Sequence, residues 1–166
     1  MIFPVCSKCL KNIDICDSCK NNLNANIDKA EIEMYKKINN ALRVEKHIKD
    51  AKIKRVFSDS KFTIIVCGKN DVGKIIGKNG IIAKKIEKKL NTDVRIVSDE
   101  SDINDFIKDV LSPSNIKGIN VVFDGEKEIF KVKMPLMEKN LLKLSPEFFK
   151  QVFYDVFNKF IEIEFE

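Results

Sequence analysis

The stretch "DVGKIIGKNGIIAKKIEKK", residues 71–89, places three glycines and six lysines around short runs of isoleucine. Gly77 and Gly80 allow the backbone to turn sharply, because glycine has no Cβ atom and adopts positive φ angles readily. Lys78 and Asn79 are expected to project from that turn. The isoleucine spacing predicts a short helix before the turn and a longer one after it. The stretch therefore predicts two helices joined by a turn that a ligand can approach closely.

Positive charge is concentrated around this turn. Residues 61–90 carry eight lysines against Asp71 and Glu87, a local charge of about +6, whereas the whole chain has 30 basic and 25 acidic residues. The next stretch, "SDESDINDFIKD", is acidic, so the positive charge forms a patch. Such a patch favours a polyanionic partner, and a solvated lysine face is the ordinary alternative.

A phosphate-binding P-loop is a second interpretation of the same segment. Residues 68–74, "GKNDVGK", match the first seven positions of that motif and follow a strand-like run. The eighth position requires serine or threonine to hold magnesium, but this chain has Ile75 there. We therefore do not expect a nucleotidase.

Cys6, Cys9, Cys16 and Cys19 form two CxxC hooks in "CSKCLKNIDICDSC". Two hooks supply the four thiolates that zinc accepts in a tetrahedron, with no ligand position left open. The array therefore predicts a structural zinc knuckle rather than a catalytic metal site. Two disulfides, an iron centre or an iron-sulfur cluster are the alternatives. So short a segment, with few large apolar groups, is expected to need the metal in order to fold.

Hydrophobic periodicity predicts a mixed α+β fold for the rest of the chain. Strands are expected over residues 51–58 and 61–68, and another in "DVRIV" after the second helix of the turn. An amphipathic helix precedes these strands, with Asn26 or Asp28 near its cap. Its apolar face is predicted to consist of Ile27, Ala30, Met34, Ile38, Ala41 and Leu42.

The run "IIGKNGIIAKKI", residues 75–86, resembles the core of a KH domain, in which a Gly-x-x-Gly turn joins two helices and clamps a nucleic-acid backbone. Residues 71–123 are similar to the junction of the tandem KH domains of NusA transcription factors, especially the archaeal form. The similar features are the glycine turn, a strand, an acidic link, an amphipathic helix and "LSPS". The resemblance covers residues 27–166 and implies two type II KH modules, each with the order αββααβ.

The resemblance also implies a ligand, single-stranded RNA, with about four nucleotides per clamp. Single-stranded DNA is the alternative, because the sequence shows no reader of the 2′-hydroxyl. The start of the second helix, near Ile81, is expected to add backbone N–H groups and a positive dipole end. The residues expected to contact the ligand are Lys74, Ile76, Gly77, Lys78, Asn79, Gly80, Lys84 and Lys85.

The second module is expected to have a degenerate Gly-x-x-Gly loop. At the corresponding place the chain reads "KLSP", residues 143–146, without a glycine. Ser145 suits a helix cap, and Pro146 suits a first helical turn but removes an N–H donor. Helices are predicted over residues 136–143 and 146–159. A broad apolar arc on the second of these, including Phe148, Phe157 and Phe160, is expected to pack internally or to receive a protein partner.

These patterns predict a non-enzymatic, cytoplasmic RNA-binding protein in three parts: a zinc knuckle over residues 1–25, a KH domain over 26–100 and a KH-like domain over 101–166. Structural Zn²⁺ is the expected cofactor. RNA polymerase or another RNA-processing assembly is the expected protein partner. The alternative is an interaction adaptor that docks on polymerase, ribosome or a nuclease, with nucleic-acid affinity secondary. No apolar run approaches roughly 18 residues, so no membrane partner is expected.

Overall fold

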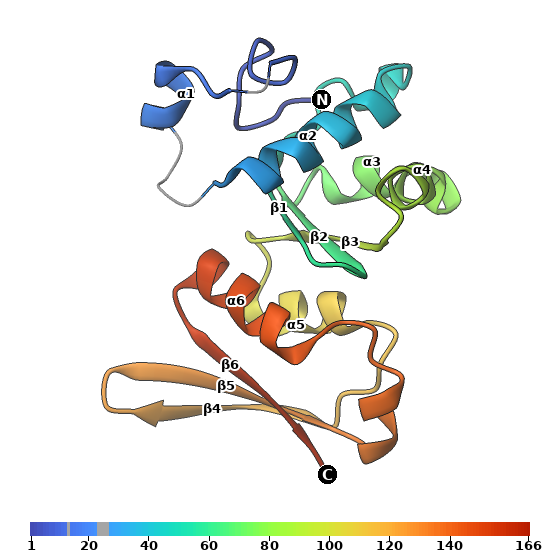
Figure 1. Ribbon diagram of the computed structural model, residues 1–166. Helices are drawn as coiled ribbons and strands as arrows, with labels where there is room; N and C mark the ends of the chain where they lie inside the picture. The colour runs from blue at the N-terminus through green and yellow to red at the C-terminus, as the bar shows by residue number, and fades with distance from the viewer. Residues whose placement is uncertain (13, 23–26) are drawn as a thin grey trace. The chain divides into compact units, whose positions relative to one another are not determined.

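The fold is mixed α+β in a computed structural model that describes residues 1–12, 14–22 and 27–166 (Figure 1). The chain divides into two compact units, Met1–Glu100 (unit 1) and Ser101–Glu166 (unit 2). The helices of unit 1 are α1 (Asp17–Asn22), α2 (Lys29–Leu42), the 3₁₀ helix η1 (Lys46–Ile48), α3 (Val72–Ile76), the 3₁₀ helix η2 (Lys78–Gly80) and α4 (Ile81–Leu90). Its strands are β1 (Ile53–Ser58), β2 (Phe62–Cys67) and β3 (Asp93–Ser98). Unit 2 consists of α5 (Ile103–Leu111), β4 (Gly118–Asp124), β5 (Lys127–Met134), the 3₁₀ helix η3 (Leu136–Asn140), α6 (Pro146–Phe157) and β6 (Phe160–Phe165).

Each unit contains a three-stranded sheet of the same topology, in the order β1-β2-β3 and β4-β5-β6. In both sheets the first pair of strands is antiparallel and the second pair is parallel. A parallel pair needs a crossover connection, which α3 and α4 provide in unit 1 and η3 and α6 in unit 2. Helices cover one face of each sheet, α2 and α4 in unit 1 and α5 and α6 in unit 2 (Figure 1). From α2 onwards, and apart from the 3₁₀ helices η1 and η2, unit 1 therefore has the same element order as unit 2: helix, strand, strand, short helix, helix, strand.

Side-chain caps define the starts of two long helices. The Asp28 carboxylate accepts a hydrogen bond from the Glu31 backbone N–H at 2.8 Å and caps α2. Asn26, the alternative cap, lies outside the described residues. The Ser145 hydroxyl accepts from the Phe148 N–H at 3.1 Å and caps α6. Both caps satisfy amides that the first turn of a helix leaves without an internal partner.

The buried face of α2 includes most of the predicted residues, since Ile38 and Leu42 are buried and Ile27, Met34 and Ala41 pack against the core. Its buried residues are Glu31, Ile32, Tyr35, Ile38 and Leu42, whereas the predicted Ala30 is exposed. Glu31 tolerates burial because its carboxylate accepts hydrogen bonds from Arg55 Nε at 3.0 Å and from the Val56 backbone N–H at 2.8 Å. The Tyr35 hydroxyl donates a third bond at 2.6 Å. Apolar periodicity misses this acid, because its partners lie partly on β1.

The N-terminal segment shares the hydrophobic core of unit 1. Its contributions to that core are Phe3, Val5, Cys9 and Cys19. Ile2 forms a parallel bridge with Lys52, just before β1. The ring of Phe3 packs against Tyr35 of α2, with 5.5 Å between the ring centroids. The cysteine-bearing segment is therefore packed on α2 and next to β1.

The short helix of unit 2 is smaller than predicted. η3 is a 3₁₀ helix of five residues in place of an α-helix over residues 136–143. The Leu141 N–H closes it by donating to the Glu138 carbonyl at 3.0 Å, a bond across three residues. Such bonds have poorer geometry than α-helical ones, so 3₁₀ helices stay short.

Helix α6 ends before the whole predicted aromatic arc is formed. Asn158 has φ 54° and ψ 37°, and this left-handed residue closes the helix after Phe157. Phe160 therefore begins β6 instead of extending the apolar face of α6. Phe148 and Phe157 are half-buried, and Phe157 meets Phe106 edge to face at 4.9 Å within unit 2. No described helix has the length and apolar character needed to span a membrane.

Candidate nucleic-acid interface and metal centre

The glycine turn, Gly77–Gly80, joins α3 to α4. Its φ and ψ angles are 74° and 168° at Gly77, 54° and 26° at Asn79, and 72° and 16° at Gly80. The conformation of Gly77 is almost confined to glycine. A Cβ atom there would overlap the Ile82 side chain and lie 3.1 Å from the Ile82 nitrogen, so glycine is also required for packing. A Cβ at Gly80 would have no atom within 4 Å. Gly77 therefore closes the turn against α4, and Gly80 leaves open space beside it.

Internal hydrogen bonds hold this turn in shape. The Gly77 N–H donates to the Gly73 carbonyl at 2.9 Å, and the Gly80 N–H donates to the Gly77 carbonyl at 3.0 Å. The Ile81 N–H donates to the Lys78 carbonyl. No side chain caps α4. Because the amides of Gly80 and Ile81 are already bonded, the start of α4 offers an anion fewer donors than predicted.

The residues predicted to contact a ligand lie together on α3, the turn and α4. The charged and amide side chains among them are all exposed: Lys74, Lys78, Asn79, Lys84 and Lys85. Ile76 is 36% exposed, and Ile81, which was not among the predicted contact residues, is 52% exposed. The turn therefore has an exposed isoleucine on each side. The signal for Ile81 in the sequence is its position as the first residue after the glycines.

Other isoleucines anchor the two helices. Ile75, Ile82 and Ile86 are buried at 0%, 3% and 0% exposure, as the apolar spacing predicts. Ile75 occupies the position at which a P-loop carries its magnesium-binding hydroxyl. Its complete burial shows that this side chain belongs to the core of unit 1.

Two of the predicted lysines have acidic partners that sequence reasoning did not assign. Lys74 Nζ lies 2.7 Å from Asp71 Oδ1, and this hydrogen bond lowers the pKa of Asp71. Lys85 forms an ion pair with Glu45, and its hydrogen bond lowers the pKa of Glu45. Both lysines are about half exposed, at 47% and 46% of the side chain. Each would have to share its charge between its partner and a bound polyanion.

Lys78 and Lys84 differ from this pair. Among the described residues, no carboxylate oxygen lies within 4.0 Å of the Nζ atom of either lysine, so neither forms an ion pair there. Lys78 lies in the turn itself, and Lys84 lies one turn into α4. Their charges are available to a polyanion without the loss of an existing ion pair.

The four N-terminal cysteines form a cluster that could hold a metal ion. Their Sγ atoms all lie within 4.8 Å of one another. The separation is 3.5 Å between Cys6 and Cys9 and 4.0 Å between Cys6 and Cys16. Four thiolates at the zinc-sulfur distance of about 2.3 Å would be about 3.8 Å apart, whereas a disulfide requires about 2.05 Å. The cluster therefore fits a tetrahedral metal.

Backbone amides support the sulfur atoms of this cluster. The Cys6 N–H donates to Cys19 Sγ at 3.3 Å, and the Cys16 N–H donates to Cys9 Sγ at 3.2 Å. A backbone hydrogen bond from Cys9 lowers the pKa of the Cys6 thiol to about 6. At Cys19 the backbone bond from Cys6 favours the thiolate, but burial and the neighbouring thiols outweigh it and raise the pKa to about 12. Four thiolates this close repel one another, so a cation is needed to ionise the full set.

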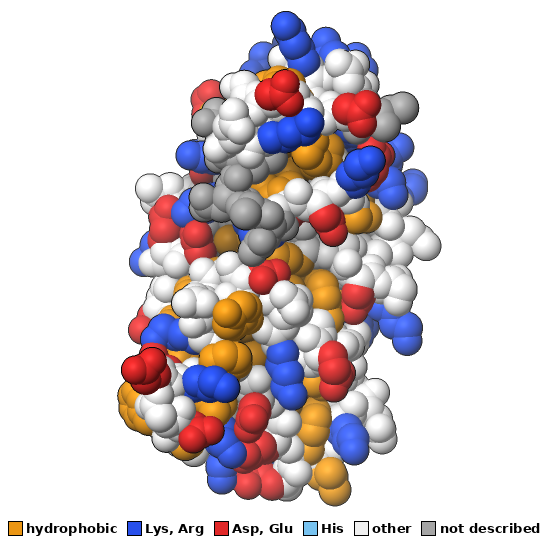
Figure 2. Space-filling model, turned by 60° about the vertical axis from the view of Figure 1, so that its left-hand side comes forward, with side chains coloured by type: hydrophobic (Ala, Val, Ile, Leu, Met, Phe, Trp, Pro, Cys, Tyr) orange, Lys and Arg blue, Asp and Glu red, His pale blue; other side chains and the backbone are white. Residues whose placement is uncertain are grey.

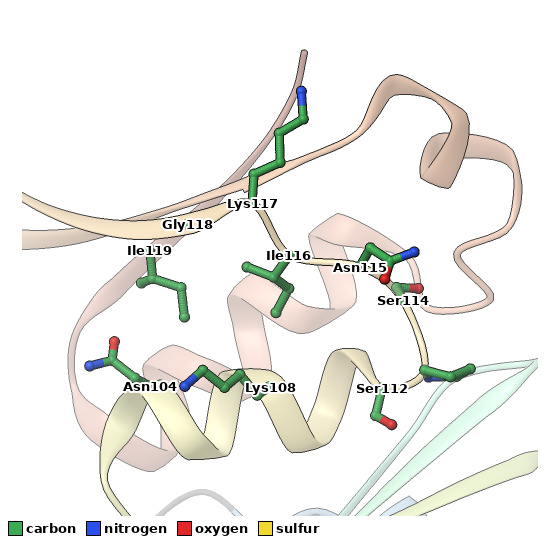
Figure 3. A pocket seen from close by; sticks show the side chains of 10 residues that line it. Asn104, Lys108, Ser112, Ser114, Asn115, Ile116, Lys117, Gly118 and Ile119 are labelled. Carbon is green, nitrogen blue, oxygen red and sulfur yellow. The ribbon is translucent and has the colours of Figure 1, made fainter.

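A pocket of about 610 Å³ lies in unit 2, between α5 and the segment that leads into β4. Figure 3 shows Ile116 and Ile119 facing α5, with Lys108 beside them and Lys117 directed away. Lys108 Nζ lies 3.8 Å from Asp105 Oδ1, and Lys117 Nζ donates a hydrogen bond to the Glu166 backbone oxygen at 2.9 Å. Both cations therefore already have partners, which makes the pocket a weaker anion site than the glycine turn.

Comparison with known proteins identifies the central part of the chain. Residues 61–116 match the KH domain family, so the chain contains a KH domain there. The matched stretch includes the glycine turn, begins just before β2 and continues beyond α5, and it does not include α2 or β1.

The chain is also similar to a crystal structure of APE1850, with a TM-score of 0.56 and 17% sequence identity. The alignment covers 83% of this chain and 100% of that chain. At this identity the likeness concerns the fold alone. No curated protein matches the chain.

Proposed function

We propose that this chain binds single-stranded RNA through the glycine turn of unit 1 and acts, without catalysis, as a NusA-like transcription or RNA-processing factor. The KH domain over residues 61–116 supports a nucleic-acid-binding role in general. The observation that carries the choice of site is the turn itself. Open space beside Gly80 adjoins exposed Lys78 and Asn79.

The chemistry of the turn suits a strand with unpaired bases. Lys78 and Asn79 can donate hydrogen bonds to phosphate oxygens, and Lys84 adds a charge that no carboxylate of the described residues shares. Ile76 and Ile81 offer apolar contacts to bases on either side of the turn. Bases reach such contacts only when they are not stacked inside a duplex. We therefore propose a single strand as ligand, with RNA preferred and DNA as the alternative.

The setting in transcription or RNA processing rests on the resemblance of residues 71–123 to NusA proteins. RNA polymerase or a related assembly is the partner that this resemblance suggests. We further propose that unit 2 is a second, KH-like domain, because its strand order and element order repeat those of unit 1. Its turn lacks the glycines, so it is not proposed to hold RNA in the same way.

We also propose that Cys6, Cys9, Cys16 and Cys19 hold one structural Zn²⁺. Four sulfur ligands complete the tetrahedron and leave no position for a reacting water molecule. The cluster stands in the N-terminal segment, whose apolar residues complete the core of unit 1. The metal would stabilise that segment against α2 without taking part in a reaction.

The RNA site can be tested with a double substitution, Lys78→Asp with Asn79→Asp. Binding of a short fluorescent single-stranded RNA to the full chain should weaken tenfold or more, because hydrogen bonds to charged groups are worth roughly 1.5 to 3 kcal/mol each. Lys37→Asp with Asn40→Asp makes the same change in charge on two exposed positions of α2 and serves as the control.

The control should bind RNA within about twofold of the original chain, because long-range charge effects are screened over roughly 8 to 10 Å at physiological salt. Amide spectra would verify that both variants are folded. Equal losses of RNA affinity in the two variants would show that the change in net charge alone causes the effect. Unchanged affinity in the Lys78 and Asn79 variant would reject the glycine turn as the RNA site.

A further inference from the structure

β4 is an edge strand of unit 2 that leaves apolar side chains at the surface. It lies at one end of the sheet order β4-β5-β6, and among the described residues only β5 pairs with it. Residues 120–124 are all exposed, with Val121 at 42%, Val122 at 41% and Phe123 at 73%. Hydrophobic side chains reach the surface at several places, as Figure 2 shows for one face of the molecule. At β4 they adjoin a strand edge, which presents N–H and C=O groups that can pair with another strand.

β4 lacks the features that protect other strand edges from association. Charged side chains, prolines and bulges on an edge strand oppose pairing with another chain. The other three edge strands of the two sheets all contain charged residues: Lys54 and Arg55 in β1, Asp93 and Arg95 in β3, and Glu162 and Glu164 in β6. β4 has no charged residue and no proline from Gly118 to Phe123, and its pairing with β5 is regular from end to end. Its edge is therefore the one best suited to accept a further strand.

The register with β5 shows which apolar side chains of β4 share a face. Val121 lies opposite Phe130, whose ring packs against Phe153 of α6 at 5.5 Å between the centroids. Because alternate side chains of a strand share a face, Ile119, Val121 and Phe123 all lie on the side of the sheet that the helices cover. The hairpin of β4 and β5 extends past the ends of both helices of unit 2, so the end of this row stays exposed (Figure 1).

A second copy of β4 matches this row in antiparallel orientation. When Val121 lies opposite Val121 of the other copy, Ile119 lies opposite Phe123 of that copy. The three apolar residues of one copy then meet the three of the other on the same face of the sheet. Cross-strand pairs of apolar side chains stabilise such a pairing. β4 is therefore complementary to itself, as a two-fold symmetric contact requires.

The charges at the ends of β4 also favour the antiparallel pairing of two copies. Asp124 and Glu126 are exposed at the hairpin end. Lys127 of β5 reaches over an aromatic ring of β6, on the far side of β5 from the open edge, and Lys117 already donates a hydrogen bond at 2.9 Å. In the antiparallel pair Asp124 lies opposite Gly118 of the other copy, so the two acidic ends are kept apart. A parallel pair would place the acids side by side, which is destabilising.

We propose that β4 pairs with β4 of a second copy of this chain, antiparallel and centred on Val121, so that two three-stranded sheets join into one. The interface consists mainly of one short strand from each copy, and small interfaces are weak, so the dimer depends on protein concentration. Nucleic acid does not fit this edge, because the exposed charges beside it are acidic. The inference does not depend on RNA binding by unit 1.

The first experiment is analytical ultracentrifugation of the full chain without RNA, over about a hundredfold range of protein concentration. The average mass should rise from one chain toward two. Hydrogen exchange measured over the same range should slow at alternate residues of β4, because alternate N–H groups of an edge strand point outward. Residues of unit 1 should exchange at rates that do not change with concentration.

The second experiment places charges at the centre of the proposed pair. Val121→Lys should raise the dissociation constant of the dimer tenfold or more, because two lysines would then lie directly opposite each other. Val121→Glu should have the same effect. A mixture of the two variants should associate at least tenfold more tightly than either variant alone, since opposite charges then face each other. Phe123→Lys is a further variant that should weaken the dimer, because it removes the contact with Ile119.

Val44→Lys is the matched control, because Val44 is 79% exposed and lies after the end of α2, outside the strands. That variant should associate as the original chain does, and amide spectra would verify that all variants are folded. A mass of one chain at every concentration would overturn the proposal. It would also be overturned by an equal loss in Val44→Lys, or by a mixture of the two Val121 variants that does not associate. A dimer without slower exchange in β4 would place the contact elsewhere and reject the strand pair.

Discussion

The glycine turn of unit 1 and the connection between β5 and α6 of unit 2 join equivalent elements but present different side chains. In unit 1, Gly77 and Gly80 form a tight turn beside exposed Lys78. In unit 2 the same connection has no glycine and exposes leucine and methionine. The comparison teaches that two units with the same order of helices and strands can present different side chains at the same connection.

The fold tolerates this difference because separate residues hold each helix. α4 is anchored by buried Ile82 and Ile86, and α6 is anchored by buried Phe149 and Val152. α6 also has the Ser145 cap, whereas α4 begins at a left-handed glycine without a side-chain cap. The helix after the turn can therefore form whether the turn keeps its glycines or not.

Removal of the metal should have the largest effect, and it should destabilise unit 1 but not unit 2. The binding free energy of structural zinc is on the order of 10 kcal/mol in small domains, so a strong chelator should unfold the N-terminal segment of unit 1. Hydrogen exchange should accelerate at residues 6–19, while residues 101–166 keep their protection. Elemental analysis of the untreated protein should find one zinc per chain.

Two results would break this part of the comparison. One is full protection of residues 6–19 after the metal has been removed completely. The other is iron, or no metal, in protein purified without chelators. A Cys16→Ser variant provides a second check, since it should lose zinc and show the same local exchange without a chelator.

Substitution of the two glycines should have a smaller effect on stability. Gly77→Ala introduces a collision with Ile82 in a glycine-only conformation and should destabilise unit 1 by about 3 kcal/mol. Gly80→Ala meets no neighbouring atom and should cost only about 1 kcal/mol for its left-handed backbone. Urea unfolding followed at the amides of unit 1 measures both values. Equal losses would mean that the two glycines do not have the distinct roles assigned here.

The sequence predicts the glycine turn and its helices well because the signals are local. Positive-φ glycines and isoleucines at helical spacing act within one segment, so they can be read without knowledge of the fold. The same holds for the cysteine hooks, whose spacing brings the sulfur atoms together through two short turns. Ser145 caps α6 for the same reason.

The missed features depend on residues far apart in the chain. Glu31 is buried because Arg55 and Val56 lie on a different element, and Lys85 is paired because Glu45 lies across from it. The predicted helix over residues 136–143 also does not show that Glu138 is the buried residue and Met137 the exposed one. Periodicity identifies an apolar face but not its tertiary partners.

The smallest expected effect distinguishes two neighbouring lysines of α4. Lys84→Ala should reduce the slope of log affinity against log salt by about 0.7, the value for one phosphate contact on a single strand. Lys85→Ala should change the slope less, because Lys85 already pairs with Glu45. Titrations at several salt concentrations would compare them. A larger change for Lys85 would contradict the assignment of Lys84 as the available charge.

The most direct test of RNA binding by unit 1 is ultraviolet crosslinking of the full chain to a short single-stranded RNA, with the crosslinked residues identified by mass spectrometry. We predict crosslinks at residues 74–85, around the glycine turn, and their loss in the Lys78→Asp, Asn79→Asp variant. Crosslinks concentrated at residues 136–147 of unit 2, with residues 74–85 free of RNA, would contradict it.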